Sequence, residues 1–227
     1  MGQSASKTKS KSNPLPRITA TFPGDPDHGQ VVMQSTAVPS KVARPRLVTK
    51  RLRCYLDVAI DGKPIGSIII HLRPDIQPRT CENFRALCTG EHGFSYQHCK
   101  FHRIVPGFVL QSGDVELKTK PKEGRGGHSI YGRSFADENL HKLSHDQYGV
   151  ISMANSGPHT NNSQFMIVVD PSGTDWLDGK HTVFGKVSKQ SFPVLEAIEH
   201  CAEVFERGGK QRARIVSTCQ ITECGVL

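Results

Sequence analysis

Residues that support enzyme chemistry occur in this sequence, but their spacing excludes several common sites. His141 and His145 have the i, i+4 spacing of paired metal ligands, yet the residues between them form no metal-binding motif. Serine, histidine and aspartate are present without the Gly-x-Ser-x-Gly sequence of a nucleophile elbow. Residues 124–127, Gly-Arg-Gly-Gly, lack the Gly-Lys-Ser/Thr ending of a phosphate-binding loop and indicate a flexible loop. The sequence therefore predicts neither a metal nor a cofactor.

Six other segments stand in a definite order along residues 52–227. They are ENFRAL (82–87), FHRIVPGF (101–108), QSGD (111–114), SMAN (152–155), SQF (163–165) and WLDGKH (176–181). Together they closely resemble the cyclophilin family of peptidyl-prolyl cis/trans isomerases, and six ordered matches are far more specific than one short motif. The resemblance implies a mainly β fold, a closed eight-stranded antiparallel barrel with two capping helices. It also implies the activity, peptidyl-prolyl cis-trans isomerase (EC 5.2.1.8).

The chemistry of this reaction requires no nucleophile, metal or cofactor. An Xaa-Pro bond rotates slowly because amide resonance imposes a barrier of about 18–20 kcal/mol. Any group that favours the twisted amide over the planar one lowers that barrier. In the twisted state the prolyl nitrogen regains a lone pair, and a permanently charged guanidinium is a suitable donor to it. The resemblance places the family's catalytic arginine at Arg103.

The resemblance also assigns the residues that bind substrate. We expect Phe108, Met166 and Leu177 to line an apolar pocket for the proline ring, with Val109 nearby and His181 at its edge. The peptide backbone is expected to be gripped at four positions, namely Gln111, Ala154, Asn155 and Gln164. Trp176 is expected on the rim, where its N–H can donate to a ligand. A tryptophan at this position goes with cyclosporin binding in the family, so cyclosporin is an expected ligand.

The sequence departs from the family pattern at two pocket positions and in two loops. Met166 stands where phenylalanine is common, and Val109 where methionine is common. Because methionine is flexible, the proline ring would be held less rigidly than by phenylalanine. The catalytic rate is the property that this substitution would affect. The loops at 115–123 and 170–175 are longer than usual. The alternative hypothesis is a catalytically weak module that binds proline-containing peptides and is tethered to a membrane.

Hydrophobic periodicity predicts the elements that must position these residues. Alternation at 54–60, a turn at Asp61-Gly62 and an apolar run at 65–72 predict a hairpin. A helix is expected from Pro78 to Gly90, and a second one near Pro193. Short strands are predicted at 100–105, 108–111, 149–154, 165–169, 183–187 and 214–222. A two-residue turn at Pro106-Gly107 would put Gln111 on the opposite face from Arg103, whereas a three-residue loop would pair them, and the sequence leaves both open.

Charge is distributed very unevenly. Residues 1–53 contain ten Lys and Arg against two acidic residues, so they account for the whole net charge of +8. Residues 1–50 also lack helix or strand periodicity, which predicts a disordered basic tail ahead of a neutral domain at 51–227. Since the folded domain lacks the basic excess of nucleic-acid-binding domains, we expect no nucleic-acid partner. A third hypothesis gives this tail the main role, binding nucleic acid or acidic lipid.

The first residues, Met-Gly-Gln-Ser-Ala-Ser, match the N-myristoylation pattern with Gly2 as the acceptor. One acyl chain binds membranes only marginally, and Lys7, Lys9, Lys11 and Arg17 would add attraction to an anionic surface. The last four residues, 224–227, formally fit a prenylation box, but we interpret them as the end of the final strand.

Seven scattered cysteines without a C-x-x-C pair indicate free thiols in a reducing compartment. There is no secretory signal and no apolar run of membrane-spanning length. We therefore expect a cytoplasmic monomer, held at the cytoplasmic face of a membrane by the myristoyl group.

Overall fold

The computed structural model describes residues 52–117, 124–208 and 210–227. The predicted tail at 1–50 and its acceptor Gly2 lie outside the described residues. The main sheet consists of β1 (Arg53–Ile60), β2 (Lys63–Leu72), β3 (Arg103–Val105), β4 (Val109–Ser112), β5 (Val150–Met153), β6 (Phe165–Val168), β7 (Val183–Val187) and β10 (Cys219–Val226). The remaining elements are α1 (Pro78–Thr89), α2 (Phe192–Glu199), the 3-10 turns η1 (Asp175–Leu177) and η2 (Lys189–Ser191), and the strands β8 (Ala202–Arg207) and β9 (Lys210–Ile215).

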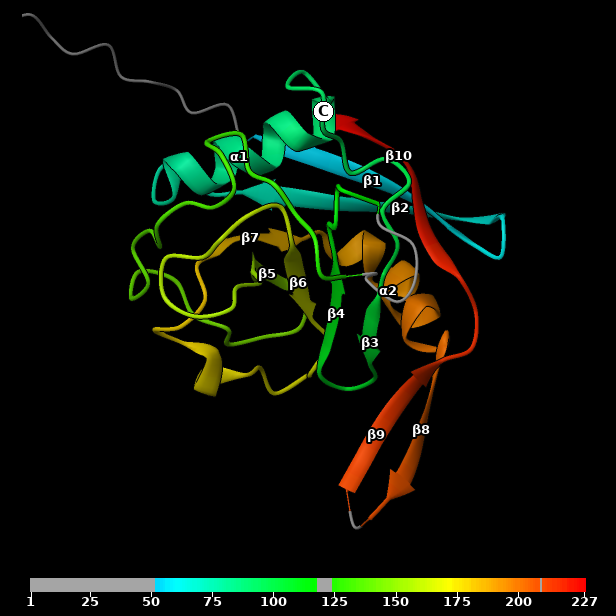
Figure 1. Ribbon diagram of the computed structural model, residues 1–227. Coiled ribbons are helices and arrows are strands. Elements are labelled where there is room, and N and C mark those ends of the chain that lie inside the picture. The colour runs from blue at the N-terminus through cyan, green and yellow to red at the C-terminus, as the bar shows by residue number, and fades with distance from the viewer. Residues whose placement is uncertain (1–51, 118–123, 209) are drawn as a thin grey trace, which may run out of the picture. The chain divides into compact units, whose positions relative to one another are not determined.

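The eight strands form one curled antiparallel sheet in the order β10-β1-β2-β7-β5-β6-β4-β3 (Figure 1). This confirms the predicted fold class and strand number. The prediction of a closed barrel slightly overstates the closure. The two edge strands form no ladder with each other, and the segment before β3 joins β10 through a single bridge between Lys100 and Gln220.

The inner face of the sheet encloses one hydrophobic core. Alternate residues of β1 are fully or almost fully buried, and they lie opposite apolar residues of β2, as Leu56 does opposite Ile68. β10 pairs with β1, with Cys224 opposite Leu56. The interpretation of the C-terminal residues as strand rather than as a prenylation box therefore fits this register.

Two helices cover the core. Proline occupies the first turn of α1, and Gly90 ends it in the left-handed conformation with φ 72°. The buried face of α1 includes Phe84, whose ring centroid lies 5.0–5.4 Å from those of Tyr96, Phe165 and Phe184. In α2, the residues Val194, Leu195 and Ile198 are buried. In the described part of the chain, no helix is long and apolar enough to cross a membrane.

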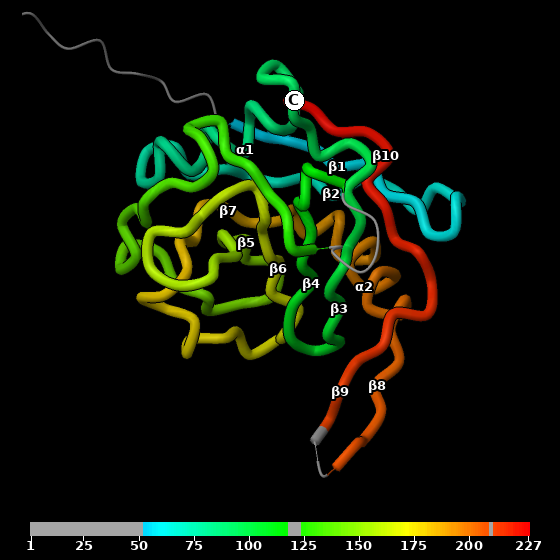
Figure 2. The backbone as a smooth tube through the Cα atoms, viewed as in Figure 1, coloured from blue at the N-terminus to red at the C-terminus, as the bar shows by residue number. Residues whose placement is uncertain are grey.

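The predicted single strand at 214–222 is wrong. The strands β8 (202–207) and β9 (210–215) pair with each other as a separate hairpin, which projects away from the main sheet (Figures 1 and 2). The chain then turns at 216–218, where the Thr218 N–H donates to the Asp61 carboxylate at 2.8 Å, before β10 begins. The other strands were predicted from apolar alternation, which marks strands with one buried face. Most side chains of this hairpin are exposed, so its sequence does not need that pattern.

Candidate active site

The register of three neighbouring strands creates a row of side chains across the outer face of the sheet. Arg103 on β3 lies directly opposite Gln111 on β4, which lies opposite Met166 on β6. Residues directly opposite one another share a face. The next row, Ile104, Leu110 and Ile167, belongs to the core. Arg103, Gln111 and Met166 therefore face outward together, and Arg103 is exposed to solvent.

The connection between β3 and β4 has three residues, Pro106, Gly107 and Phe108, because Val105 pairs with Val109. This resolves the open alternative in favour of the odd-length loop, the one that brings Arg103 and Gln111 to the same face. Gly107 adopts φ 68°, a conformation that favours glycine. Its N–H donates to the Glu199 carboxylate of α2 at 2.8 Å, so a side chain from a distant helix holds the loop.

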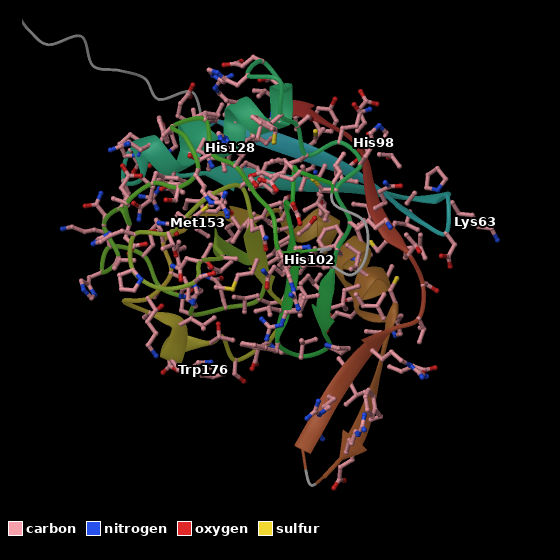
Figure 3. The ribbon with its side chains drawn as sticks, in the orientation of Figure 1. Lys63, His98, His102, His128, Met153 and Trp176 are labelled. Carbon is pink, nitrogen blue, oxygen red and sulfur yellow. The ribbon has the colours of Figure 1, made fainter. Side chains whose placement is uncertain are left out.

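Two aromatic rings stand beside this row. The Phe108 and Trp176 rings are stacked with centroids 5.9 Å apart, and the Arg103 guanidinium carbon lies 5.8 Å from the centroid of the Phe108 ring. Trp176 is 54% exposed and lies at the periphery of the ribbon in Figure 3, in agreement with a rim position. Met166 is 4% exposed and Leu177 is half-buried. The stacked rings of Phe108 and Trp176 form an apolar patch next to a cation.

Val109 was expected near the pocket, and it lies beneath the surface. It is fully buried opposite Val168, which packs with Val150, Val183 and the partly buried Leu143 in a small second apolar cluster. His181 is half-buried, and its Nδ1 lies 3.0 Å from the Met153 carbonyl oxygen. Burial lowers the pKa of His181. The ring is thus mainly neutral near pH 7.

The amide side chains that were expected to bind the substrate backbone already form hydrogen bonds within the protein. The Gln164 Nε2 group donates to the carbonyl oxygens of Gly124 and Gly126 at 3.0 and 2.7 Å, and its Oε1 accepts from Gln111 at 2.8 Å. Asn155 donates to the Lys180 carbonyl oxygen at 2.8 Å. Gln164 therefore orients Gln111 and anchors a loop, while Gln111 remains partly exposed. Ala154 is 9% exposed and donates its N–H to the Gln164 carbonyl oxygen.

Three supporting groups were not identified from the sequence. One is Glu199, described above. The second is Asp114, 6% exposed, whose carboxylate accepts from the Gly126 N–H at 3.0 Å. It lies in the QSGD segment, so its place in that motif was the available signal. The third is the pair His145 and Asp178, with Nδ1 and Oδ1 2.6 Å apart, which links a buried histidine to the residue after η1.

His145, Asp178 and Ser152 have the composition of a catalytic triad, but they cannot act as one. Ser152 and His145 are both fully buried, and in the neutral tautomer Ser152 donates to His145 Nε2 at 2.9 Å. The set instead fixes the segment that carries Trp176 and Leu177. In the described residues, no group of three or more His, Cys, Asp and Glu side chains is placed to hold a metal ion.

The buried histidine makes stability depend on pH. Burial lowers the pKa of His145 from 6.5, although Asp178 acts in the opposite direction. Because the folded-state pKa lies below the unfolded value, the stability from neutral His145 is present above pH 6.5 and is lost as the pH falls below it.

We expect the free energy of unfolding, from urea titrations at several pH values, to fall less steeply on acidification in His145→Gln than in the wild type. An unchanged slope in His145→Gln would contradict the assignment.

The geometry thus combines an exposed guanidinium, an oriented amide and an apolar patch on one face of a curled antiparallel sheet. A comparison with protein-family models gives a match to the cyclophilin type peptidyl-prolyl cis-trans isomerase/CLD family over residues 55–226. This match covers most of the chain and all six segments in which the resemblance was found. The chain belongs to the cyclophilin-type peptidyl-prolyl cis-trans isomerase family.

Proposed function

We propose that this isomerase assists protein folding by binding Xaa-Pro segments on the outer face of β3, β4 and β6. One observation supports this most strongly, the direct pairing of Arg103 with Gln111 beside Met166. The pairing puts a permanent cation, a hydrogen-bonding amide and an apolar side chain in one row. An Xaa-Pro segment presents the complementary features, namely a peptide nitrogen, peptide carbonyl groups and an apolar ring.

In the proposed mechanism the proline ring packs against Phe108, Met166 and Leu177. Gln111 holds the peptide backbone on one side of the bond, together with main-chain groups near Ala154 and Asn155. As the amide twists, Arg103 donates to the prolyl nitrogen, which accepts a hydrogen bond only in the twisted state. The arginine therefore stabilises the transition state more than the planar ground state. Each reduction of the barrier by about 1.4 kcal/mol raises the rate tenfold.

Replacing Arg103 tests this mechanism. We expect Arg103→Ala to lower kcat/KM for a short Xaa-Pro peptide by about 10²–10³-fold, as removal of one preorganised donor does elsewhere. Because Arg103 is exposed, the urea midpoint should stay close to that of the wild type. A matched control is Arg133→Ala, an exposed arginine outside this row. Turnover in Arg103→Ala at the wild-type rate would eliminate the proposed role.

A second candidate function is proline-peptide binding without useful turnover, and Met166 is the observation that favours it. If the flexible methionine holds the ring too loosely, the wild type will bind Xaa-Pro peptides but isomerise them poorly, and Met166→Phe will restore the rate. The enzymatic proposal expects the wild type itself to turn over the peptide, so the same assay decides between the two.

Cyclosporin binding is proposed on the basis of Trp176. This residue is the only tryptophan in the chain, it is exposed, and it stacks on Phe108. A ligand on the apolar patch would cover it, so we expect cyclosporin to change its fluorescence and to inhibit isomerisation. Trp176→Phe should weaken the inhibition while retaining turnover, because an indole N–H is lost and an aromatic ring is kept. Equal inhibition of both proteins would contradict a direct role for Trp176.

The tail supports a further proposal, that Gly2 is myristoylated and holds the enzyme at the cytoplasmic face of a membrane. After co-expression with an N-myristoyltransferase, the wild type should float with vesicles containing phosphatidylserine, and Gly2→Ala should remain in the aqueous fraction. Replacing Lys7, Lys9 and Lys11 by glutamine should weaken binding to these vesicles, since each basic residue near an anionic surface contributes about 1 kcal/mol. Flotation of the wild type and Gly2→Ala to the same extent would contradict the lipid anchor.

A further inference from the structure

The β8–β9 hairpin forms one wall of a cavity next to the proposed active site. The cavity has a volume of about 460 Å³ and lies between the hairpin and β3. Its lining includes, from the β3 side, Arg103, Val105 and Pro106, and from the hairpin Val204, Ala213 and Ile215. Arg103 thus belongs both to the outer row of the site and to the lining of this cavity.

The hairpin presents two chemically different faces. Val204 pairs with Ala213, and Ala202 with Ile215, so these residues share one face, the one that lines the cavity. The opposite face carries Glu203 paired with Arg214, joined by a 2.9 Å ion pair, and Phe205 paired with Arg212. The face turned toward β3 also carries the pair Glu206 and Gln211 near the end of the hairpin, and it is still the less polar of the two faces.

This apolar face is incompletely covered. Val204 is 52% exposed and Ile215 is 37% exposed, although both lie against β3. Burying solvent-exposed β-branched side chains under an apolar group is favourable, because it removes apolar surface from water. The cavity is large enough for one aliphatic side chain and the backbone that carries it.

The charges at the cavity favour an anion. Arg103 lines it, and no Asp or Glu is among the described residues of the lining. Arg212 also borders the cavity, but the register puts its side chain on the opposite face of the hairpin, with Phe205. The hairpin as a whole carries more basic than acidic side chains. A carboxylate beside the aliphatic side chain would be attracted by the Arg103 guanidinium.

We propose that this cavity is an additional substrate subsite for the segment that flanks the proline. It takes an aliphatic side chain a few residues from the proline, next to a carboxylate. The inference rests on the proposed function, because the same polypeptide must cross Arg103 and continue into the cavity. It assigns the isomerase a preferred substrate class, proteins in which an Xaa-Pro bond lies close to an aliphatic-acidic pair.

The test compares peptides that share one Ala-Ala-Pro-Ala core. The core is extended on either side of the proline by a short Gly-Ser spacer followed by Leu-Glu, Leu-Lys or Ser-Ser, and kcat/KM is measured with the full-length protein. On one of the two sides of the proline, we expect kcat/KM for the Leu-Glu peptide to be about five- to tenfold higher than for the Ser-Ser peptide. Partial burial of one aliphatic side chain predicts a difference of this size. Leu-Lys should fall between them. Equal values for all extensions on both sides would overturn the inference while leaving the proposed function intact.

Two adjacent residues provide a matched pair of variants. Val204→Asp puts a carboxylate into the cavity, whereas Phe205→Asp makes the same change of charge on the opposite face, and both side chains are exposed. Val204→Asp should remove the advantage of Leu-Glu over Ser-Ser, and Phe205→Asp should keep it. An equal loss in both variants would overturn the subsite, since a general change of charge or hairpin stability would then explain the result.

If no peptide is isomerised, the proposed function is wrong. Peptide affinity then tests the subsite independently of turnover. Fluorescence anisotropy of the labelled peptides would then give dissociation constants for the wild type and the two variants. Tighter binding of Leu-Glu than of Ser-Ser, lost only in Val204→Asp, supports the subsite. Equal binding of both peptides overturns it.

Discussion

The antiparallel register of β3, β4 and β6 is the constraint on which the other features of the site depend. In a strand, successive side chains point to opposite faces, so one register sends Ile104, Leu110 and Ile167 into the core and the alternate row outward. A slip of one residue between β3 and β4 would separate Arg103 from Gln111 and expose an apolar residue to water. The core and the site are therefore fixed by the same hydrogen bonds.

The register itself is maintained by contacts from outside these strands. The three-residue loop sets the pairing of β3 with β4, and Glu199 holds that loop through the Gly107 N–H. On the other side, Gln164 and Asp114 hold the segment at 124–126. The hydrogen bonds of Gln164 and Asp114 are partly buried, and buried polar groups are costly unless they are paired, so these bonds favour one arrangement of the segment. Strands thus form the base of the site, and hydrogen bonds from distant side chains hold the loops at its borders.

A site of this kind suits isomerisation of an amide. Isomerisation makes and breaks no covalent bond. The protein therefore supplies only an apolar surface, backbone contacts and one positioned cation. The Arg103 guanidinium is available for this because it is exposed and lies beside the Phe108 ring. Substrate preference then depends on what surrounds the cation, and here the β8–β9 hairpin adds a surface beyond it. Reaction and selectivity can accordingly reside in different parts of the chain.

The sequence by itself determined the family, both helices and every strand of the main sheet in outline except the last, because these depend on local periodicity and on motifs of fixed spacing. It also contained an unused signal, Gly208-Gly209, since two glycines between short polar runs are typical of a hairpin turn. Only the tertiary structure decided the loop length that pairs Arg103 with Gln111, the incomplete closure of the sheet, and the engagement of Gln164 and Asn155 within the protein. It also placed the hairpin beside β3. Each of these is a contact between residues far apart in the chain, and the free energy of such contacts depends on the folded path of the backbone rather than on local sequence.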